Sequence, residues 1–460
     1  MAERTTRRQF LKVAAMGGAS AWAACGGGRL LLPADGGEPG LDAGLPLDKP
    51  EALTESGAFM FGIASGDALA DRVVLQTRYD GAAALRLRVW RMEGAVYAER
   101  VADAAVTPFD GGFVHLDVSG LVPGARYGYA FLEETAGQPP TRSALGRFRA
   151  ALAPGQVEPL VFGAVSCTSL DSAPACLAHA AARTDLAAFL LLGDTTYNDT
   201  ATTLAAYRTR WAQSLSRAEY RALRASTSLL ATWDDHEVTN DFNPEQVPAA
   251  RMTMARQTFF ESLPLRRDAL QADRLWKTVR WGDSVELFVL DGRGERKPST
   301  RLSADPIYLS PTQLDWFKAG LKASPCALKL ILNSVPISDF GFSAFNADGW
   351  RAYQKQRLEI LKFIEAENIR GVLWLSGDHH FASAGTISAS GPGTAAIEVL
   401  AGPGSQSSNP LWNLLKPPRW DFASGTNNYL AVHCDPVKRE AKVVFHDAKG
   451  ATLFDKTYAL

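Results

Sequence analysis

Several features that assign a chain to a familiar class are scarce or missing here. The 460 residues include only five cysteines, scattered along the chain, which excludes a disulfide scaffold. The 48 lysines and arginines nearly balance the 49 aspartates and glutamates, so no overall field favours nucleic acid or an anionic membrane. After residue 24, no apolar run approaches the roughly 20 residues of a membrane-spanning helix. We therefore expect neither an integral membrane protein nor a specific nucleic-acid partner.

Two catalytic signatures are also absent. No Gly-x-Ser-x-Gly sequence occurs, which disfavours a serine hydrolase. A cysteine phosphatase would need an arginine shortly after Cys167 to bind phosphate, and residues 168–174 contain none. The remaining composition, 46% hydrophobic and 21% charged residues, is ordinary for a globular protein, and the length predicts about two domains.

The amino terminus carries a targeting pattern. The pair Arg7-Arg8 precedes an apolar, small-residue run from Val13 to Ala24, which indicates a twin-arginine (Tat) signal peptide over residues 1–25. Export through the Tat machinery would place the protein in the periplasm or at the cell surface. Cleavage is expected either before Cys25, which would then carry a lipid and tether the protein to the membrane, or simply near Ala24. A cytoplasmic amphipathic helix that happens to contain Arg-Arg is the alternative.

The next two segments differ in composition and in hydrophobic periodicity. Residues 26–54 are rich in glycine, proline and aspartate and show no hydrophobic period, so we expect a flexible linker. Residues 55–152 show short runs with the period of two that half-buried strands require. Examples of these runs are 72–78, 85–90 and 126–131. Because Leu121–Tyr127 is similar to a tyrosine-anchored corner, we predict a fibronectin- or immunoglobulin-like β-sandwich over 55–152.

Residues 153–460 alternate strands with helices and form the predicted second domain. Predicted helices are 175–184, 202–225, one that begins at the Ser310 cap with Pro311, and 352–366. Predicted strands include 275–281, 285–290, 328–332, 396–400 and 443–446. The expected fold class is α/β, with two mixed sheets packed face to face and helices outside, an αββα sandwich.

Four apolar stretches of this domain end in residues that can bind metals. They are Phe162–Cys167, Phe189–Asp199, Leu229–Glu237 and Val372–His380. A short apolar run before a turn is typical of a buried parallel strand, and ligands bind beyond the carboxyl ends of such strands. We therefore expect the terminal side chains to converge at one sheet edge. They are Cys167, Asp194, Tyr197, Asp235, Asp378 and His380.

These residue types fit a pair of metal ions. Hydrolysis of a phosphate ester needs an activated water and neutralisation of charge at phosphorus, and two ions roughly 3.5–4 Å apart supply both. Asp194, at the end of a central strand, is the natural bridging ligand. Tyr197 and Cys167 as anions favour iron. Asp235 and Asn333, with Asp234, form an oxygen-rich set that suits calcium, or else manganese or zinc.

In combination, these motifs resemble the PhoD-type alkaline phosphatases and phosphodiesterases of the calcineurin-like metallophosphoesterase superfamily, relatives of purple acid phosphatases. The motifs are Ser166-Cys167, Gly193-Asp194-x-x-Tyr197, Trp233-Asp234-Asp235-His236-Glu237, Asp291-x-Arg293 and Ser376-Gly377-Asp378-x-His380. The resemblance implies Fe³⁺ held by Cys167, Asp194, Tyr197, Asp378 and His380. It implies a second ion, Ca²⁺, held by Asp194, Asp235 and Asn333. Where the superfamily often has Gly-Asn-His-Glu, this chain has two aspartates, so the resemblance leaves open which of them binds metal.

Each candidate also has a structural interpretation. Cys167 could be a buried small hydrophobe, Tyr197 a core residue and His236 a structural hydrogen-bond partner. Arg293 either stabilises charge in the transition state or pairs with an acid such as Glu295. His379 is expected to support the site rather than to bind metal. His236, Arg293 and Asp234 remain the predicted catalytic residues, with His236 assisting departure of the leaving group.

The predicted function is an exported, monomeric phosphoesterase that acts on small phosphate mono- and diesters through a metal-activated hydroxide. A lipid- or nucleotide-specific phosphodiesterase is a competing interpretation within the enzymes. A surface binding protein with a purely structural metal site is the alternative from another class.

Overall fold

The computed structural model describes residues 28–31, 49–339, 349–409 and 417–460. The predicted signal peptide, Cys25 and most of the predicted linker lie outside these ranges. Within them, no helix combines the length and the apolar character that crossing a membrane requires.

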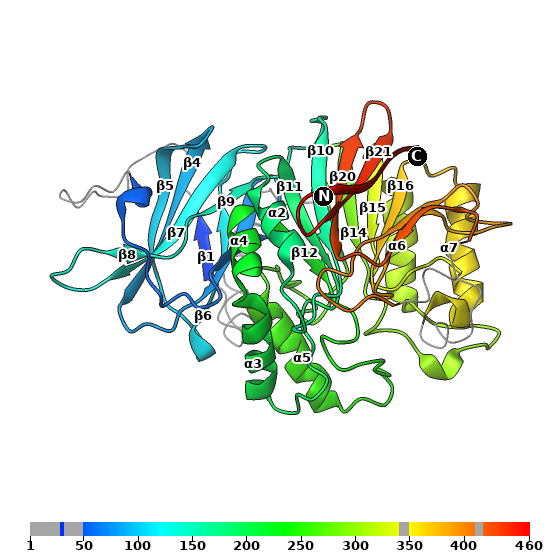
Figure 1. The fold of residues 1–460 in the computed structure, drawn as a ribbon, viewed down its shortest axis with the longest axis horizontal. Helices are drawn as coiled ribbons and strands as arrows, with labels where there is room; N and C mark the ends of the chain where they lie inside the picture. Colours follow the sequence, from blue (N-terminus) through cyan, green and yellow to red (C-terminus); the bar gives the residue numbers. More distant parts are fainter. Residues whose placement is uncertain (1–27, 32–48, 340–348, 410–416) are drawn as a thin grey trace, which may run out of the picture.

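A ten-stranded mixed sheet extends through most of the molecule (Figure 1). Its strand order is β1-β6-β3-β2-β12-β11-β10-β20-β21-β22. Their bounds are β1 Gly28–Leu31, β2 Ile63–Gly66, β3 Arg72–Arg78, β6 Phe113–Ser119, β10 Leu160–Val165, β11 Leu186–Leu192, β12 Ser228–Thr232, β20 Asn428–Asp435, β21 Glu440–Asp447 and β22 Thr452–Ala459. Strands β10, β11 and β12 are parallel, so their carboxyl ends meet at one edge.

The long sheet crosses the predicted boundary between the two domains. Strand β2 pairs in parallel with β12, with Ser65 opposite Ser228 and Gly66 opposite Leu229. The strands β2, β3 and β6 of the N-terminal region therefore continue the catalytic sheet. Such pairing between distant strands leaves no periodic signature in the sequence, so it could not be predicted.

A second sheet of seven strands packs against the first. Its order is β13-β14-β15-β16-β18-β17-β19, with bounds β13 Lys277–Trp281, β14 Val285–Val289, β15 Leu328–Leu332, β16 Val372–Ser376, β17 Ala382–Thr386, β18 Ile397–Leu400 and β19 Trp420–Ser424. Alternate residues face opposite layers: Leu330 and Leu332 join the large core between the sheets, and Ile331 joins a separate cluster with residues of the helices outside. Two packed sheets with outer helices are what the sequence predicted.

A third, antiparallel sheet lies at the N-terminal end of the molecule. It consists of β4 Ala84–Glu93, β5 Val96–Val106, β7 Arg126–Glu134, β8 Thr141–Arg142 and β9 Gly146–Arg149. The predicted tyrosine anchor is present, because the Tyr127 hydroxyl accepts a hydrogen bond of 2.8 Å from the Val122 amide. The buried rings of Tyr127 and Phe148 stack with centroids 5.2 Å apart.

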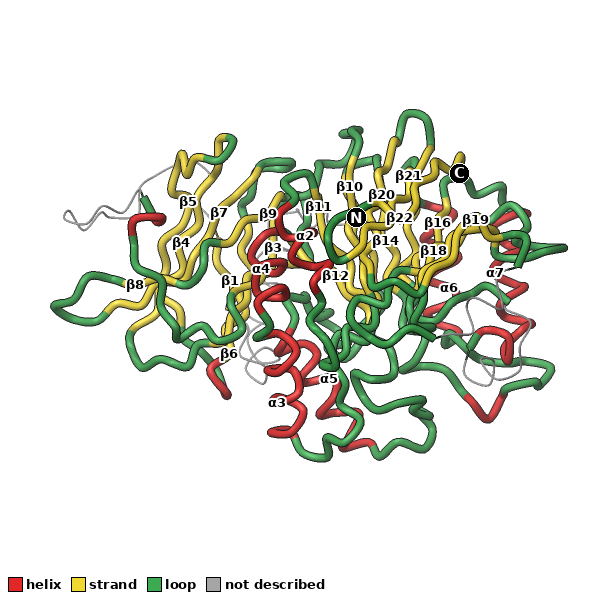
Figure 2. The backbone as a smooth tube through the Cα atoms, in the orientation of Figure 1, coloured by secondary structure: helices red, strands yellow, loops and turns green. Residues whose placement is uncertain are grey.

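Helices flank the strands on the outside of the sheets (Figure 2). They are α2 Ala175–Ala182, α3 Leu204–Leu215, α4 Ala218–Ser226, α5 Ala249–Ser262, α6 Pro311–Ala323 and α7 Gln354–Ala366, with 3-10 turns at Pro50–Ala52, Asp110–Gly112, Pro298–Thr300 and Trp350–Tyr353. The predicted cap of α6 is confirmed, since the Ser310 side chain accepts a hydrogen bond from the Gln313 amide.

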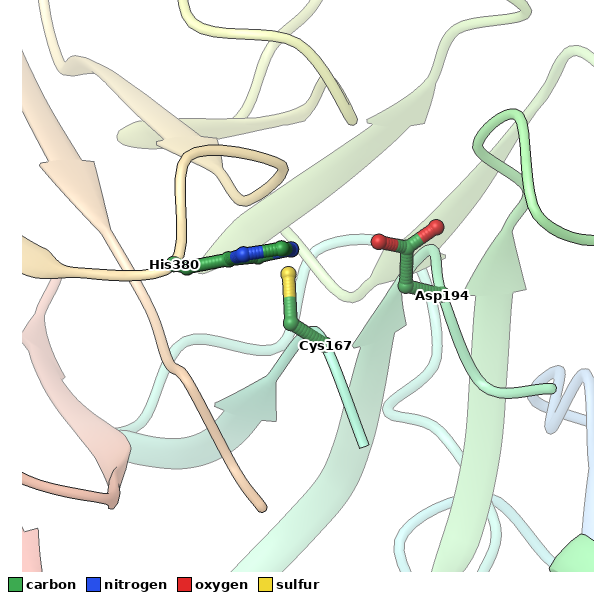
Figure 3. A group of neighbouring side chains, drawn as sticks. All are labelled: Cys167, Asp194 and His380. Atoms are coloured by element: carbon green, nitrogen blue, oxygen red, sulfur yellow. The ribbon is translucent and has the colours of Figure 1, made fainter. Parts of the chain in front are cut away.

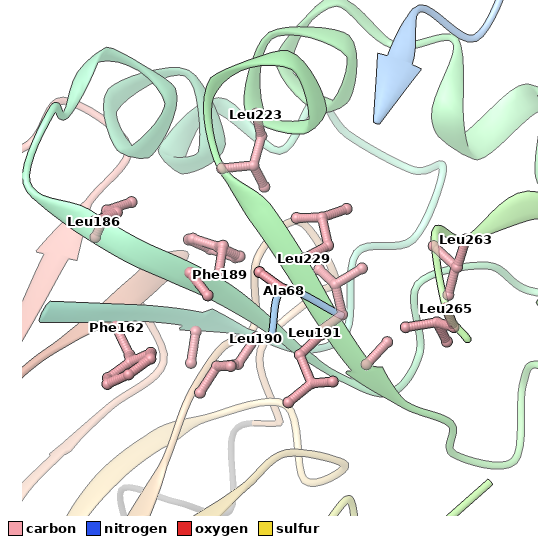
Figure 4. Close-up of a cluster of buried hydrophobic side chains, with 14 of the residues drawn as sticks. Ala68, Phe162, Leu186, Phe189, Leu190, Leu191, Leu223, Leu229, Leu263 and Leu265 are labelled. Carbon is pink, nitrogen blue, oxygen red and sulfur yellow. The ribbon is translucent and has the colours of Figure 1, made fainter. Parts of the chain in front are cut away.

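One helix prediction was wrong. The single helix expected over 202–225 is two helices, because Arg217 adopts an extended backbone conformation between α3 and α4. The Arg217 guanidinium donates hydrogen bonds to the carbonyls of Thr168, Ser169 and Ser214. A contact to a loop fifty residues away thus ends α3, and α4 turns to pack over the sheet. Figure 4 shows Leu223 of α4 directed toward Phe189 and Leu229 of the strands.

Candidate metal centre

The polar residues that follow the parallel strands meet at one edge of the two packed sheets. Cys167 follows β10, Asp194 follows β11, and Asp234 and Asp235 follow β12. From the second sheet, Arg293 follows β14, and Asp378 and His380 follow β16. The sequence predicted this convergence from the apolar runs that precede each residue.

The backbone of this region is strained. Cys167, Asp194, Asp378 and His380 all have φ between 53° and 66°. Residues with a Cβ adopt this left-handed conformation only where the surrounding structure compensates for its cost, and such sites cluster at functional centres. Four predicted ligands share the same unfavourable geometry, which indicates that side-chain placement takes precedence over local backbone preference.

Two glycines let the strand ends approach each other. A Cβ on Gly193 would lie 2.5 Å from Cβ of Asp234, and one on Gly377 would lie 2.4 Å from Cβ of Ser166. Real Cβ atoms do not approach so closely. The Gly-Asp pairs at 193–194 and 377–378 therefore bring neighbouring loops within reach of a shared ligand.

The first group of candidate ligands is Cys167, Asp194 and His380, shown in Figure 3. Each offers one ligand atom, and these atoms all lie within 4.8 Å of one another. In the figure, the thiol and the imidazole face each other and the carboxylate lies beside them. The Tyr197 hydroxyl lies 3.4 Å from Oδ2 of Asp194, at the edge of the same group.

Two further groups overlap with the first. Asp194, Asp235 and His236 form one, and Asp234, Asp235 and Asp378 form the other, each again within 4.8 Å. Asp194 belongs to the first two groups and Asp235 to the last two. This sharing is the geometry that a bridging carboxylate requires.

A cavity of about 410 Å³ opens onto these groups. It is lined by Asp194, Asp235, His236, Asn240, Asp241, Asn243, Arg296, Pro298, Arg301, Asp378, His379, His380 and Asn409. Asp235 therefore faces the cavity, whereas Asp234 is fully buried behind it. This difference favours Asp235 over Asp234 as the residue that contacts a ligand in the cavity.

Arg293 lies behind the carboxylates and is only 1% exposed. Its Nη2 is 3.1 Å from Oδ1 of Asp378 and 3.6 Å from Oδ1 of Asp235, and its Nε donates to Asp234. Pairing with Glu295, the alternative weighed above, is not what the structure shows: Glu295 accepts hydrogen bonds from Trp276 and Ser310. Arg293 thus neutralises part of the acidic cluster and does not line the cavity.

Burial is the largest influence on the pKa values of most acidic groups in this cluster. It raises the pKa of Asp194 and of Asp234 well above the usual range of a carboxyl group. Burial, with the charge of Asp194, likewise raises the pKa of the Cys167 thiol and of the Tyr197 phenol. A bound cation would favour the ionised form of these groups, because an opposite charge nearby stabilises an anion.

Asp378 is the exception within the cluster. Burial alone would raise its pKa, but His379 and Arg293 lower it below the ordinary value of an aspartate. Nδ1 of His379 lies 2.7 Å from Oδ2 of Asp378. His379 therefore supports a neighbouring carboxylate, as the sequence predicted.

The residues present fit a metal ion. Among the residues that the structure describes, Oδ1 of Asp194 and Oδ2 of Asp234 are buried and accept no hydrogen bond. A buried oxygen without a partner is costly, and metal coordination would satisfy it. Thiolate, carboxylate and imidazole ligands together suit a transition metal at the first group.

Two functional residues were not predicted. Asp199 accepts a hydrogen bond of 2.8 Å from Nδ1 of His236, and the His236 ring lies against Tyr197 with centroids 4.2 Å apart. Burial alone would lower the pKa of His236, but Asp194 and Asp199 raise it to about 10. The only sequence signal for Asp199 is its position in the loop that carries Asp194.

Glu237 is the second residue of the site without a predicted role. Its fully buried carboxylate accepts hydrogen bonds from the amides of Asp194, Thr195 and Asp234, at 3.1, 2.6 and 2.8 Å. It thereby joins the loops after β11 and β12, including the strained backbone at Asp194. The Trp-Asp-Asp-His-Glu motif contained it, but no local pattern revealed its partners.

Asn333 does not line the cavity. Its side-chain amide donates to the Val335 carbonyl, and its Oδ1 accepts from the Trp350 indole at 3.4 Å. Both ends of the amide are therefore engaged away from the three ligand groups, and its role as a metal ligand stays a prediction.

Comparisons with known proteins agree with this geometry. The family model described as PhoD-like phosphatase matches residues 162–417, more than half of the chain, and the model described as PhoD-like phosphatase, N-terminal domain, matches 47–152. Alkaline phosphatase D of Bacillus subtilis (strain 168) is 28% identical over 379 residues. That match covers 70% of this chain but 64% of the relative, so the chain spans less than two thirds of that protein.

Two solved structures share the fold. One, titled "Structure of PhoD", has a TM-score of 0.74 at 22% identity and covers 91% of this chain and 90% of its own. The other, purple acid phosphatase PPD1 from yellow lupin (Lupinus luteus) seeds, has a TM-score of 0.62 at 12% identity and covers 86% of this chain and 73% of its own. With the family model spanning the strand ends that carry every candidate ligand, the chain belongs to the PhoD-like phosphatase family.

Proposed function

We propose that the chain is an exported, metal-dependent phosphoesterase that hydrolyses small phosphate mono- and diesters at a binuclear centre. The observation that carries this proposal is the overlap of three ligand groups that share Asp194 and Asp235 beside one cavity. Family membership and the alkaline phosphatase D relative support phosphoric ester hydrolysis as the reaction.

In this proposal the two ions are Fe³⁺ and Ca²⁺, with Mn²⁺ or Zn²⁺ as alternatives for the second. Cys167, Asp194, Tyr197, Asp378 and His380 would hold the iron, and Asp194, Asp235 and Asn333 the second ion. When bound, such ions lower the pKa of water and neutralise charge on phosphoryl oxygens.

His236 is positioned to protonate the leaving group. It lines the cavity, and its Nδ1 is bonded to Asp199, which leaves Nε2 for the substrate. The hydrogen bond to Asp199 raises the pKa of His236 and favours the protonated imidazole, which can donate to the departing oxygen. Arg293 contacts the carboxylates of Asp234, behind the cavity, and of Asp378, which lines it, and so holds both in place.

The remaining parts of the proposal concern the whole protein. The N-terminal region of 55–152 is a fibronectin- or immunoglobulin-like sandwich that restricts access to the substrate cavity, and the catalytic region packs as an αββα sandwich. The protein is a monomer that leaves the cytoplasm already folded through the Tat machinery. It then resides in the periplasm or at the cell surface, either freed by cleavage near Ala24 or tethered through Cys25.

The competing function is a surface binding protein in which metal only supports the fold. Metal analysis of the purified protein, combined with assays on mono- and bis-(4-nitrophenyl) phosphate, separates the two. We expect His236→Ala to retain the metal and to lose most hydrolysis of both esters. Hydrolysis that is absent in the wild type, or unchanged in His236→Ala, would favour the binding protein.

A second measurement tests the ligand set directly. A ferric ion bound to a phenolate or a thiolate gives a visible charge-transfer band, which we expect to shift in Tyr197→Phe and in Cys167→Ser. Cys434→Ser is the matched control, because Cys434 is an equally buried free cysteine on β20, far from the site. A band that is unaffected by the first two variants would remove both residues from the proposed iron site.

A further inference from the structure

A second cavity lies at the junction between the N-terminal sheet and the catalytic region. Its volume is about 660 Å³, within the range of sites for small organic ligands. Its walls come from β9, the start of β7, the turn between β4 and β5, the end of α4 and the loop before β11. It shares no lining residue with the candidate metal centre.

The two cavities lie at opposite ends of the same strands. Leu186, the first residue of β11, and Thr227, just before β12, line the second cavity. The other ends of β11 and β12 lead to Asp194 and Asp234. With about 3.3 Å of rise per residue, the seven residues of β11 separate the two cavities by roughly 20 Å.

Arginines gather on one face of the β7–β9 ladder. Arg126 lies directly opposite Arg149, and Arg147, two residues along β9 from Arg149, lies opposite Gly128. Because side chains alternate along a strand, all three arginines occupy the same face. Like charges directly opposite each other in a ladder are destabilising, so folding alone does not account for this arrangement.

Carboxylates compensate only part of this charge. Arg149 pairs with Glu158, and Arg183, a fourth arginine of the cavity, pairs with Asp185. Arg147 donates to the carbonyls of Ser226, Ala181 and Arg183 at the ends of α4 and α2. Within the described part of the chain, neither Arg147 nor Arg126 forms an ion pair. Partial burial, followed by the charges of Arg149 and Arg147, lowers the pKa of Arg126.

Apolar side chains lie beside the arginines on the same face of the sheet. The Tyr97 ring lies over Gly128, where a Cβ would meet it at 2.3 Å, and it packs edge-on against Trp90 with centroids 5.6 Å apart. Met92 and Leu145 extend this apolar group. Cationic and aromatic side chains thus lie side by side along one cavity.

We propose that this interdomain cavity binds an organic phosphate, with its phosphoryl group on Arg126 and Arg147 and its apolar or aromatic part against Tyr97. A dianionic phosphoryl group supplies the two negative charges that the arginines lack. The guanidinium of Arg126 can bind two of its oxygens, and Arg147, whose Nε and Nη2 donate to carbonyls, can contribute Nη1. The organic part fills the volume that a phosphate ion alone would leave. The site is independent of hydrolysis at the metal centre, since the two cavities share no residue.

Hydrogen–deuterium exchange of the purified protein with phenylphosphonate tests the proposal. A phosphonate has no ester bond to hydrolyse, so the probe survives whether or not the protein is a phosphoesterase. We expect slower exchange over residues 145–149 and 222–227, which border the cavity. Absence of protection in these two segments at saturating probe overturns the proposal.

Variants identify the groups that bind. Arg126→Glu removes an exposed side chain that makes no hydrogen bond, so we expect the fold and the basal ester hydrolysis to be unchanged. Protection of the two segments should need about 10- to 100-fold more phenylphosphonate, the range for loss of a hydrogen bond between charged groups. Arg370→Glu, which makes the same charge change at another exposed position, should leave this titration unchanged. Equal titrations for wild type and Arg126→Glu contradict the proposal.

Two comparisons define the ligand chemistry. Tyr97→Ala should weaken phenylphosphonate and leave inorganic phosphate unaffected, because only the former has a ring to pack. Benzoate, which has the ring but a single carboxylate charge, should protect the segments far more weakly. Benzoate binding as strong as that of phenylphosphonate would overturn the assignment of a phosphoryl group, and an unaffected Tyr97→Ala would overturn that of an apolar part.

Discussion

Two buried clusters of charged residues in this protein differ in how their charges balance. One, the junction cluster, joins the N-terminal strands to the second sheet: Asp67 and Asp117 are matched by Arg266 and Lys277. The other, at the candidate metal centre, places four aspartates beside one arginine and three histidines, which are His236, His379 and His380. In the balanced cluster both carboxylates pair with cationic side chains, although Oδ1 of Asp67 accepts no hydrogen bond from the described residues. The unbalanced cluster holds more buried carboxylates than its cationic side chains pair with, and this excess of negative charge points to a cation.

The largest expected effect comes from the shared ligand of the unbalanced cluster. Asp194→Asn should lower kcat/KM for phosphate esters by ~10²–10³-fold or more, because it removes the charge that two ligand groups share. Without metal, however, the variant should be at least as stable as the wild type at pH 8. Burial raises the pKa of Asp194 in the folded state, so ionising it costs stability as the pH rises above the unfolded value, and asparagine avoids that cost.

Melting curves with and without a chelator, together with ester hydrolysis, check both halves of this prediction. An Asp194→Asn protein that unfolds well below the metal-free wild type would show that the two clusters do not differ in the way described.

Breaking the balanced cluster should lower the stability of the protein and leave its hydrolytic activity unchanged. Asp67→Asn leaves the buried ammonium of Lys277 without its partner, and loss of one member of such a pair costs about 3–5 kcal/mol. Denaturant unfolding measures this loss, and hydrolysis per folded molecule should stay at the wild-type value. The control is Asp80→Asn, which breaks the partly exposed pair with Arg78 and should cost less than about 1 kcal/mol.

His115 gives the junction region a pH dependence. Burial, with the charge of Arg267, lowers its pKa from 6.5 to about 4. Between those values the unfolded chain binds a proton that the folded protein does not, so stability present above pH 6.5 is lost as the pH falls toward 4. The loss is at most about 3 kcal/mol. Unfolding of wild type and His115→Gln at pH 7 and pH 4.5 isolates it, and an equal change in both proteins would contradict the assignment.

The smallest effect is expected at Asp199. Asp199→Asn should reduce hydrolysis about tenfold, because it removes the partner that orients His236. It should also lower the pKa of His236, which Asp199 helps to raise, so activity should decline at a lower pH on the alkaline side. A pH–rate profile measures this shift, and a profile that differs only in height would make Asp199 a purely structural residue.

The sequence predicted those parts of the site that depend on local pattern. An apolar run, a glycine and an aspartate locate Asp194 and Asp378 at strand ends, and parallel pairing brings such ends together. Contacts between separate loops left no comparable signal. The three amides that bind Glu237 and the pairing of Asp199 with His236 depend on how two turns lie side by side.

The same limit applies to the fold. Helical periodicity correctly predicted helix over most of 202–225, but the break at Arg217 depends on carbonyls of a loop after β10. Alternation predicted the strands of the N-terminal region, but their order depends on backbone pairing over long separations. The pairing of β2 with β12 and the opposition of Arg126 and Arg149 are both of this kind.

The parallel pairing of β2 with β12 affects how the protein folds and unfolds. Removing the first 150 residues would leave β12 as an unpaired edge strand, whose backbone could pair with another chain. A truncated catalytic fragment should therefore aggregate, and the intact chain should denature cooperatively as one body. Two family models match the N-terminal and C-terminal regions separately, but the β2–β12 pairing joins these regions into one cooperative unit.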